Sequence, residues 1–518
     1  MNRRWEVPAY DYLVVGAGTA GCVLASRLSE NEDTRVLLLE AGAREPLEAM
    51  AAPTSWFTLL GTSADWATTS VVQEFTGEPH LLSRGRCLGG SSSINGLNFL
   101  RGHRSSYDAW EAAGATGWRF ADLLPYFRRT ERAEKRDPRT RGTDGPMTVS
   151  VSAERNPVLA ACVAAAIQVG HPPADDVSSG LEEGFGWCDN TIVDGVRQSV
   201  ADAYLRPVLD RPNLDVVTDA LVHRLRLEGG RCTGVDYSVG NTMISAECSR
   251  EVVLTAGTIG SAQLLLLSGI GQAEHLREVG VDVVHDLPGV GANLHDHPLA
   301  MVTYSAKRSV QAMPGNPPSE ALGLVRSALA LDAPDLQILF VSVPIRPPAL
   351  PGPAVGYTIA FSAITPHSRG SLRLTSADAT VAPLVDPNYL ADDHDVATIT
   401  DGLRLAREIG NAEFLAPWRG EEVPAAPDAG DLAAVHSYLA ASLMPYFHYV
   451  GTCRMGVDEM AVVDPELRVR GIDGLRVADA SVMPSIVSAN TNATVCAIAE
   501  RAVDLITGRD PVKVLMSP

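Results

Sequence analysis

A glycine-rich turn near the start of the chain, between an apolar run and a helical pattern, constrains the fold more than any other feature. Apart from Asp11, residues 11–15 are apolar and mostly branched, which predicts a buried strand. The turn that follows carries Gly16, Gly18 and Gly21 in the spacing G-x-G-x-x-G, and a helical pattern over 22–28 comes next. Strand, turn and helix in this order form the first half of a dinucleotide-binding βαβ unit. The sequence therefore predicts an α/β fold with a phosphate site at one helix N-terminus.

The three glycines of this turn are each required for a different reason. Gly16 permits the tight turn, Gly18 lets a pyrophosphate approach the main chain, and Gly21 lets the helix pack closely on the strand. The helix N-terminus is then aimed at phosphate. The predicted cofactor contacts also include the residues between the glycines, which are Ala17, Thr19 and Ala20.

A carboxylate follows where a ribose-binding acid is expected. The apolar run 36–39 predicts a second buried strand that ends at Glu40, about 20 residues beyond the last glycine. A carboxylate there accepts hydrogen bonds from ribose hydroxyls and repels a 2′-phosphate, so NADP is disfavoured. Ala41 is the next predicted cofactor contact. A glycine turn can also serve packing alone, and the motif by itself does not distinguish NAD from FAD.

Several later segments have equally specific patterns. Residues 84–102, RGRCLGGSSSINGLNFLRG, are rich in glycine and serine without being a low-complexity linker. Such a segment lets the backbone lie against a ligand, although a surface turn would share this composition. Residues 250–271 predict strand, glycine turn and helix, and 213–227 predict two alternating strands. The C-terminal quarter holds FHYVGTCRMG at 447–456 and SANTNAT at 488–494.

The fingerprint and these segments, taken in order, resemble the glucose-methanol-choline (GMC) family of FAD-dependent alcohol oxidoreductases. The resemblance runs from residue 11 to residue 508, and the C-terminal part is similar to choline dehydrogenase-like and alcohol oxidase-like members. It implies that FAD is the cofactor and that residues outside the first turn also contact it. These are Gly85, Gly89, Gly90, Ser92, Asn95, Gly96, Val222, Ala256, Gly257, Asp479, Ala480, Asn490 and Thr491.

Details of flavin attachment follow from the same resemblance. In some members of the family a histidine just before the loop asparagine bonds covalently to the flavin, and in this chain Ile94 takes that place. Isoleucine has no nucleophilic nitrogen, so the resemblance predicts non-covalent FAD. Asp479 is expected to hold a cofactor hydroxyl. The helical pattern over 491–505 is expected to direct its N-terminus toward the flavin.

The resemblance also implies that His448 is the catalytic base and that Asn490 is its partner. An alcohol does not lose its proton unaided at neutral pH, whereas histidine, with a pKa of about 6.5, can accept one there. Asparagine can donate a hydrogen bond to the developing alkoxide and orient the substrate oxygen. A hydride then passes from carbon to flavin N5, and the product is an aldehyde or ketone. The expected substrate contacts are Phe447 and Tyr446, next to the histidine.

Alternatives remain open for both activity and metal binding. A hydroxynitrile lyase on the same scaffold would carry FAD without turning it over, but such lyases resemble a two-histidine arrangement rather than a His/Asn pair. A non-catalytic flavin-binding protein would need neither His448 nor Asn490. His295 and His297, in NLHDHP, have the chemistry of metal ligands. Because no cysteine or second cluster accompanies them, a structural loop and no metal are expected there.

The patterns predict two domains. A Rossmann-like FAD-binding domain of α/β type is discontinuous in the sequence. Its parts are residues 8–155, 196–299 and 456–510. The inserted substrate-binding domain is expected to be α+β and built on an antiparallel sheet, because strand-like runs alternate with proline-rich segments there. Its parts are residues 156–195 and 300–455.

Composition restricts partners and location. A net charge of −20 disfavours nucleic acid or an anionic membrane as a partner, because like charges repel. No separate apolar signal segment precedes the first strand, and no apolar run reaches about 18 residues, so no transmembrane segment is expected. Eight scattered cysteines without C-x-x-C spacing indicate a reducing compartment, and a cytoplasmic location is predicted. The partner is a small alcohol and the electron acceptor is oxygen or a carrier; the sequence assigns no oligomeric state.

Overall fold

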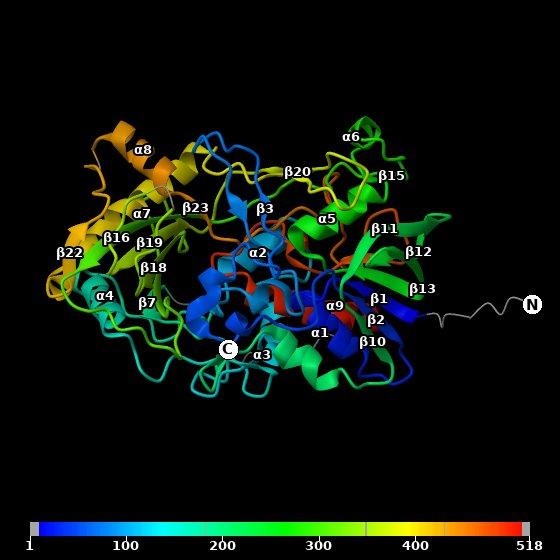
Figure 1. Cartoon of the computed structure of the whole chain (residues 1–518), viewed down its shortest axis with the longest axis horizontal. Helices are drawn as coiled ribbons and strands as arrows, with labels where there is room; N and C mark the ends of the chain where they lie inside the picture. The colour runs from blue at the N-terminus through cyan, green and yellow to red at the C-terminus, as the bar shows by residue number, and fades with distance from the viewer. Residues whose placement is uncertain (1–9, 182, 348–349, 429, 510–518) are drawn as a thin grey trace, which may run out of the picture.

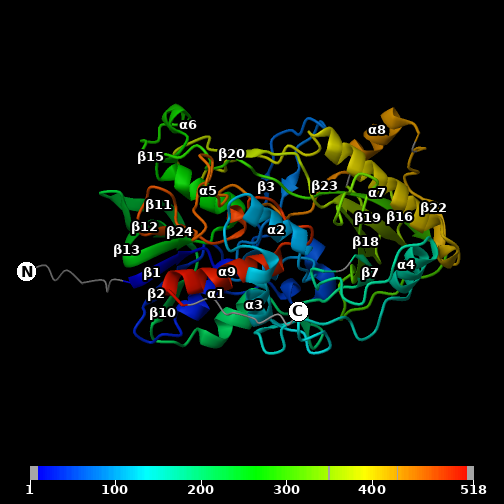
Figure 2. The same cartoon turned by 180° about the vertical axis from the view of Figure 1, so that it is seen from behind.

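Two lobes, each built on its own sheet, make up the molecule (Figure 1). The computed structural model describes residues 10–181, 183–347, 350–428 and 430–509. The predicted domain limits at residues 8 and 510, and the N-terminal segment 1–9 used to predict location, lie outside these ranges. Seen from behind, the lobes remain side by side (Figure 2).

The first lobe contains the predicted parallel sheet. Its strands, in spatial order, are β10 (Leu214–Val217), β2 (Val36–Leu39), β1 (Tyr10–Val15), β13 (Thr242–Leu254), β12 (Arg231–Val239) and β11 (Ala220–Glu228), with β24 (Leu475–Val477) also paired to β13. The pairs among β10, β2, β1, β13 and β24 are parallel, and those among β11, β12 and β13 are antiparallel. The long strand β13 belongs to both parts. This sheet confirms the predicted α/β fold class.

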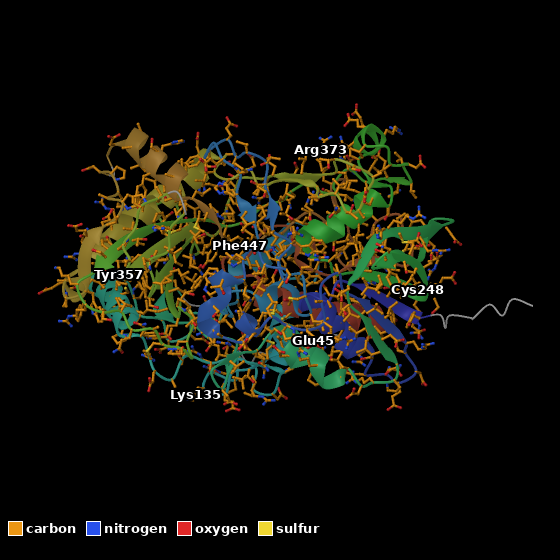
Figure 3. All side chains as sticks on the ribbon, viewed as in Figure 1. Glu45, Lys135, Cys248, Tyr357, Arg373 and Phe447 are labelled. Carbon is orange, nitrogen blue, oxygen red and sulfur yellow. The ribbon has the colours of Figure 1, made fainter. Side chains whose placement is uncertain are left out.

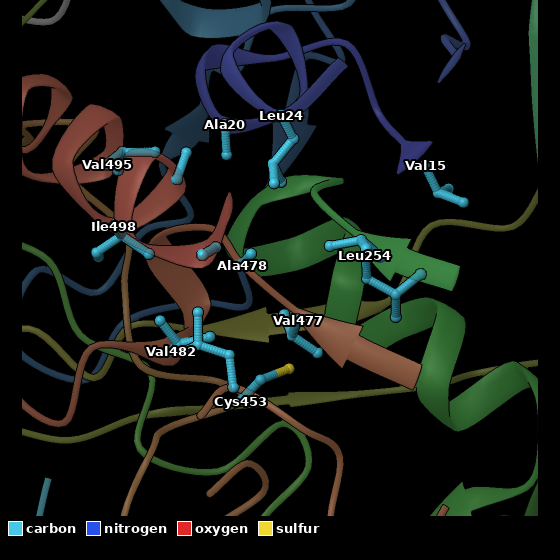
Figure 4. Close-up of a cluster of buried hydrophobic side chains, with 14 of the residues drawn as sticks. Val15, Ala20, Leu24, Leu254, Cys453, Val477, Ala478, Val482, Val495 and Ile498 are labelled. Atoms are coloured by element: carbon cyan, nitrogen blue, oxygen red, sulfur yellow. The ribbon is translucent and has the colours of Figure 1, made fainter. Parts of the chain in front are cut away.

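Helices α1 (Thr19–Leu28) and α9 (Asn492–Thr507) pack against each other beside this sheet. Figure 4 shows Leu24 of α1 and Ile498 of α9 in one apolar cluster with Leu254 and Val477 of the strands. These four side chains are completely or almost completely buried. A Cβ on Gly21 would lie 1.8 Å from the Gly16 oxygen, so only glycine allows this approach of helix to turn. The packing reason predicted for this glycine is thereby confirmed.

The second lobe holds an antiparallel sheet, as predicted for the inserted domain. Its order is β22 (Arg419–Glu422), β16 (Pro298–Ala306), β19 (Gly356–Ala363), β18 (Leu336–Val341), β17 (Ala321–Val325) and β7 (Gly184–Trp187), with β23 (Met444–Pro445) also paired to β16. Three helices cover one face, namely α4 (Pro157–Gln168), α7 (Asp393–Asn411) and α8 (Leu432–Ser442). Alternate side chains of β16, β18 and β19 point to the other face and form a separate apolar cluster.

The division into domains stays a proposal, and two features of the chain bear on where its limits lie. Strand β16 crosses the limit set between residues 299 and 300. The pair β20 (Ser371–Arg373) and β21 (Leu384–Asp386), placed in the substrate domain, buries Leu372 and Val385 in the core of the first lobe. We retain the remaining limits as a proposal.

Further helices and short strands lie outside the two large sheets. They include α2 (Arg104–Ala112), α3 (Phe120–Thr130), α5 (Gly257–Leu267), α6 (Ala273–Glu278), β3 (Thr68–Thr69), β4 (Leu81–Leu82), β5 (Glu131–Arg132), β6 (Met147–Thr148), β8 (Ile192–Val193), β9 (Val196–Arg197), β14 (Ile270–Gly271) and β15 (His285–Asp286). Within the described ranges, no helix has both the length and the hydrophobicity that a membrane span requires.

Candidate active site

A cavity of about 510 Å³ is lined by side chains from both lobes. Phe447, which lies between the lobes in Figure 3, is part of its wall. Most of the residues predicted from the sequence line this one cavity. They are Gly16, Gly18, Thr19, Ala20, Glu40, Ala41, Gly85, Gly90, Ser92, Asn95, Gly96, Val222, Ala256, Gly257, Tyr446, Phe447, His448, Asp479, Ala480, Asn490 and Thr491. Ala17, Gly21 and Gly89 are not part of the lining and lie behind it.

The glycine and serine loop contacts the fingerprint turn directly. Gly90 has φ +52°, and a Cβ added there would lie 2.7 Å from the Cα of Gly18. Gly18 is the N-cap of α1, and the space where its own Cβ would project is open except for one oxygen at 3.9 Å. Gly257, with φ +75°, has no atom within 4 Å of its Cβ position. Bare backbone at a helix N-terminus beside open space fits a dinucleotide pyrophosphate.

Glu40 is buried at the end of β2 and is bound by the backbone around it. Its two carboxylate oxygens accept hydrogen bonds from the N–H groups of Ala17 and Gly42, each at 2.8 Å. Burial raises the pKa of this carboxyl to about 7. A carboxylate has about four acceptor positions, so those left over suit the ribose hydroxyls predicted for this site.

Asp479 accepts hydrogen bonds from the backbone and side chains around it. Its carboxylate accepts four hydrogen bonds: from the N–H of Gly257 at 2.9 Å, the hydroxyl of Ser261 at 2.6 Å, and the N–H and hydroxyl of Ser481 at 2.9 and 2.6 Å. These occupy the acceptor positions of the carboxylate. Asp479 also lines the cavity, and its contact with a cofactor hydroxyl stays a prediction. Its carboxylate also holds the cavity-lining turn at Ala256 and Gly257.

The predicted catalytic pair meets at the cavity. Nε2 of His448 lies 3.2 Å from the amide nitrogen of Asn490, just before α9 begins. On the other side of the ring, Nδ1 of His448 lies 3.0 Å from Nδ1 of His297. Nε2 of His297 lies 3.1 Å from the carbonyl oxygen of Ile364 and must donate its proton there. With both rings neutral, Nδ1 of His297 accepts from His448, which leaves Nε2 of His448 unprotonated toward Asn490.

Burial keeps both rings neutral. It lowers the pKa of His448 well below its ordinary value, and the charge of a protonated His297 would lower it further. Burial likewise lowers the pKa of His297 to about 3. A neutral imidazole with a free Nε2 can accept a proton from a hydroxyl placed in the cavity.

A buried carboxylate, Asp296, holds both histidine segments in place. Its Oδ1 accepts the backbone N–H of His448 at 2.6 Å and that of His297 at 2.9 Å, and its Oδ2 accepts the hydroxyl of Tyr389 at 2.6 Å. Burial raises the pKa of Asp296 to about 7. Phe447 has φ +63°, a strained conformation for a bulky side chain. The contacts of Asp296 with the adjacent backbone stabilise this turn.

Sequence reasoning missed Asp296 and His297, since the segment was expected to be a structural loop. That expectation fits His295, whose Nδ1 donates to the oxygen of Asn293 at 2.7 Å and whose Nε2 accepts the N–H of Ile486 at 2.9 Å. It is wrong for His297, which contacts the predicted base. The sequence does show Asp296 and His297 directly before a predicted strand. No local pattern, however, connects this pair to His448, which is far away in the chain.

Two further residues singled out from the sequence, Tyr446 and Ile94, also line the cavity. Tyr446 donates its hydroxyl to Oε1 of Gln337 at 2.7 Å, and its ring centroid lies 4.2 Å from that of His448. Ile94 lines the cavity.

A possible metal-binding group lies elsewhere in the described part of the chain. It consists of His367, His394 and Asp395, whose possible ligand atoms all lie within 4.8 Å of one another, and it does not include the pair His295 and His297 considered from the sequence. Both carboxylate oxygens of Asp395 already accept backbone N–H groups.

Comparison with known proteins agrees with this architecture. Two family models described as GMC oxidoreductase match residues 10–299 and 366–499. Choline dehydrogenase, mitochondrial, of Homo sapiens is 38% identical over 96% of this chain and 90% of its own. The crystal structure of pyridoxine 4-oxidase from Mesorbium loti superposes with a TM-score of 0.92 at 34% identity, covering 95% of this chain and 98% of that one. A formate oxidase from Aspergillus oryzae, studied for its FAD modification, has a TM-score of 0.90 at 27% identity, with 96% and 98% covered. The chain is therefore an oxidoreductase and belongs to the GMC oxidoreductase family.

Proposed function

We propose that this protein is an FAD-dependent enzyme that oxidises a primary or secondary alcohol to an aldehyde or ketone. The observation that carries the proposal is the position of Nε2 of His448, 3.2 Å from the amide nitrogen of Asn490 at the wall of the cavity. A base and a hydrogen-bond donor at one point are what a hydroxyl needs to lose its proton.

The first lobe offers the features of an FAD site. The fingerprint turn, the glycine loop and Glu40 line one side of the cavity, and Thr491 and Asn492 at the start of α9 line it as well. Bound FAD would supply the hydride acceptor for the reaction. Ile94 presents no nucleophile to a flavin, which supports non-covalent binding.

The residues of this chain divide the remaining tasks between them. A substrate hydroxyl between Nε2 of His448 and the amide of Asn490 would donate its proton to the ring and accept a hydrogen bond from the amide. Asn490 then stabilises the negative charge that develops on oxygen. Asp296 and His297 act as positioning residues, because they fix the turn and the tautomer of the base.

The rival activity is a hydroxynitrile lyase on the same scaffold. The histidine found beside His448 faces Nδ1, whereas the group at Nε2 on the cavity side is an amide. This arrangement supports oxidation over the two-histidine chemistry of the lyase. By likeness to the relatives named above, a pyridoxine-like alcohol is a candidate substrate, whereas choline, the alcohol in the name of the other relative, is not favoured.

The proposal also covers the electron acceptor of the enzyme and its location in the cell. The electron acceptor is oxygen or a carrier. All eight cysteines are free and buried, which supports a reducing, cytoplasmic location.

Flavin bleaching tests the proposed function. We expect the purified protein to be yellow, to release FAD on acid treatment, and to lose its visible flavin absorbance when a suitable alcohol is added without oxygen. Admitting air then distinguishes an oxidase from a dehydrogenase. Bound FAD that no alcohol bleaches, together with release of aldehyde from a cyanohydrin, would favour the lyase instead.

A further inference from the structure

The sheet of the second lobe contributes an apolar wall to the cavity. It is formed by Leu299 and Met301 of β16, Leu339 and Val341 of β18, and Ala360 of β19. Met301 and Leu339 both lie opposite Ala360 in the strand register, so the three form a continuous row. A surface of this kind contacts the hydrocarbon part of a ligand and gains free energy from its burial.

The charges of the cavity lining do not suit a cation. Among the described residues that line it, the carboxylates are Glu40 and Asp479, which belong to the first lobe and bind backbone N–H groups. A cation is present as well, since Arg84 lines the cavity. Its Nη2 donates to the hydroxyl of Thr68 at 2.5 Å, and its buried Nε has no hydrogen-bond partner within the described part of the chain. Burial lowers the pKa of Arg84 to about 10, so the group stays charged at neutral pH.

Two aromatic rings of the lining are already engaged. The guanidinium of Arg86 lies 5.1 Å from the ring centroid of Trp66, and that of Arg84 lies 5.7 Å from it. Tyr446 places its ring against His448, with 4.2 Å between centroids and 34° between planes. A cage for a quaternary ammonium needs several free ring faces around one point. The aromatic residues of the lining are Trp56, Trp66, Tyr446, Phe447 and Tyr449, and two of them, Trp66 and Tyr446, are already in ring contacts.

We propose that the alcohol accepted by this cavity is uncharged and carries an apolar body, and that quaternary ammonium alcohols are poor substrates. The inference rests on the proposed oxidation and deepens it by naming the substrate class. An apolar wall does not replace the hydration of a cation, and the described lining residues include no carboxylate on the side of the second lobe to pair with it. Among the wall residues, Leu299 is the specificity-determining position, because it is partly exposed, follows His297 closely on β16 and pairs with Met444 of β23.

A pair of isosteres tests the proposal on the holoenzyme. Choline and 3,3-dimethylbutan-1-ol have the same shape and differ in replacing the ammonium nitrogen by carbon. We expect kcat/KM for anaerobic flavin reduction to be at least about 100-fold higher for the neutral alcohol, because the charge would be buried unpaired. Benzyl alcohol, also neutral and apolar, should likewise exceed choline.

A matched pair of variants assigns the selectivity to the wall. Leu299→Glu should raise the choline to dimethylbutanol ratio of kcat/KM by at least about 10-fold, since it places a carboxylate beside the substrate. Leu299→Gln, of nearly the same size and without charge, should not. Bound flavin per chain checks that both variants fold.

The outcomes separate this inference from the proposed function. Bleaching with choline preferred over its neutral isostere would leave alcohol oxidation standing and overturn the substrate class alone. No bleaching by any of the three alcohols, with FAD bound, would count against both. An unchanged ratio in folded Leu299→Glu would overturn the assignment of Leu299.

Discussion

At the scale of single residues, the site depends on one ring held in one tautomer. Nδ1 of His448 donates to Nδ1 of His297, Nε2 of His448 lies beside the amide nitrogen of Asn490, and Asp296 accepts the backbone N–H of His448. Each of these groups affects a different property: proton acceptance, tautomer, or position. Substitutions at the residue scale should therefore give distinct kinetic results.

Removing the base should stop flavin reduction without releasing the cofactor. We expect His448→Gln to slow anaerobic flavin reduction by about 100- to 10,000-fold, because proton acceptance by a placed base contributes that much. Stopped-flow absorbance measures the rate, and bound FAD per chain shows that the site persists. His367→Gln, at an exposed histidine, serves as the control. An unaltered rate in His448→Gln would refute its role as the base.

The pH dependence should reveal the lowered pKa of His448. The ring must be neutral to accept a proton, so kcat/KM falls as pH drops through its pKa. Because burial and His297 place that pKa below the ordinary 6.5, activity should persist at pH 6, where an ordinary histidine is mostly protonated. A pH profile of kcat/KM with an uncharged alcohol tests this. An acid limb with a midpoint at or above about 6.5 would contradict the shift.

Loss of the Asp296 carboxylate should impair catalysis by disturbing the position of His448. Asp296→Asn weakens the anchor shared by the two histidine segments, and we expect kcat to fall at least about 10-fold with a smaller change in KM. Tyr389→Phe, which leaves the backbone contacts of Asp296 intact, should have the milder effect. Steady-state kinetics of both variants at several pH values measure this. Equal loss of kcat in the two would show a merely structural role.

At the scale of elements, the contact between the fingerprint turn and the glycine loop shapes the proposed cofactor site. The N-terminus of α1 and the loop at Gly90 come from segments far apart in the chain, and they approach without side chains between them. The site is thus formed by backbone at this point.

A methyl group at this contact should weaken cofactor binding. Gly90→Ala introduces a Cβ 2.7 Å from the Cα of Gly18 and a side chain at φ +52°. Gly61→Ala, at φ +73° with no atom within 4 Å, carries the conformational cost alone, roughly 1–2 kcal/mol. We expect Gly90→Ala to lose most of its bound FAD and Gly61→Ala to keep it, measured as flavin per chain after gel filtration. Full FAD in Gly90→Ala would show that the loop can shift.

At the scale of the whole molecule, a buried charge cluster connects the two lobes. Arg141 is fully buried and lies 2.8 Å from Glu131 of the first lobe and 2.8 Å from both Asp176 and Asp189, which flank β7 of the second sheet. Removing one member of such a cluster leaves buried charge without compensation.

Loss of this cluster should destabilise the fold. We expect Arg141→Met to lower the free energy of unfolding by about 3–5 kcal/mol. Arg139→Met, in the same loop with 88% of its side chain exposed, should cost less than about 1 kcal/mol. Urea unfolding followed by tryptophan fluorescence compares them. Similar midpoints for the two variants would mean that the buried cluster contributes no net stability.

The sequence by itself determined the fold class and much of the cofactor side. The strand, glycine turn and helix at residues 10–28 are local, because each glycine spacing demands one backbone arrangement, and the resemblance extended this to the glycine loop and to His448 with Asn490. Only the tertiary structure decided the partners of those residues. His297, which contacts His448, lies 151 positions from it in the chain. The carboxylate of Asp479 accepts hydrogen bonds from Gly257 and from two serines. Such contacts depend on how separate strands are packed, and no local pattern encodes which distant side chains meet.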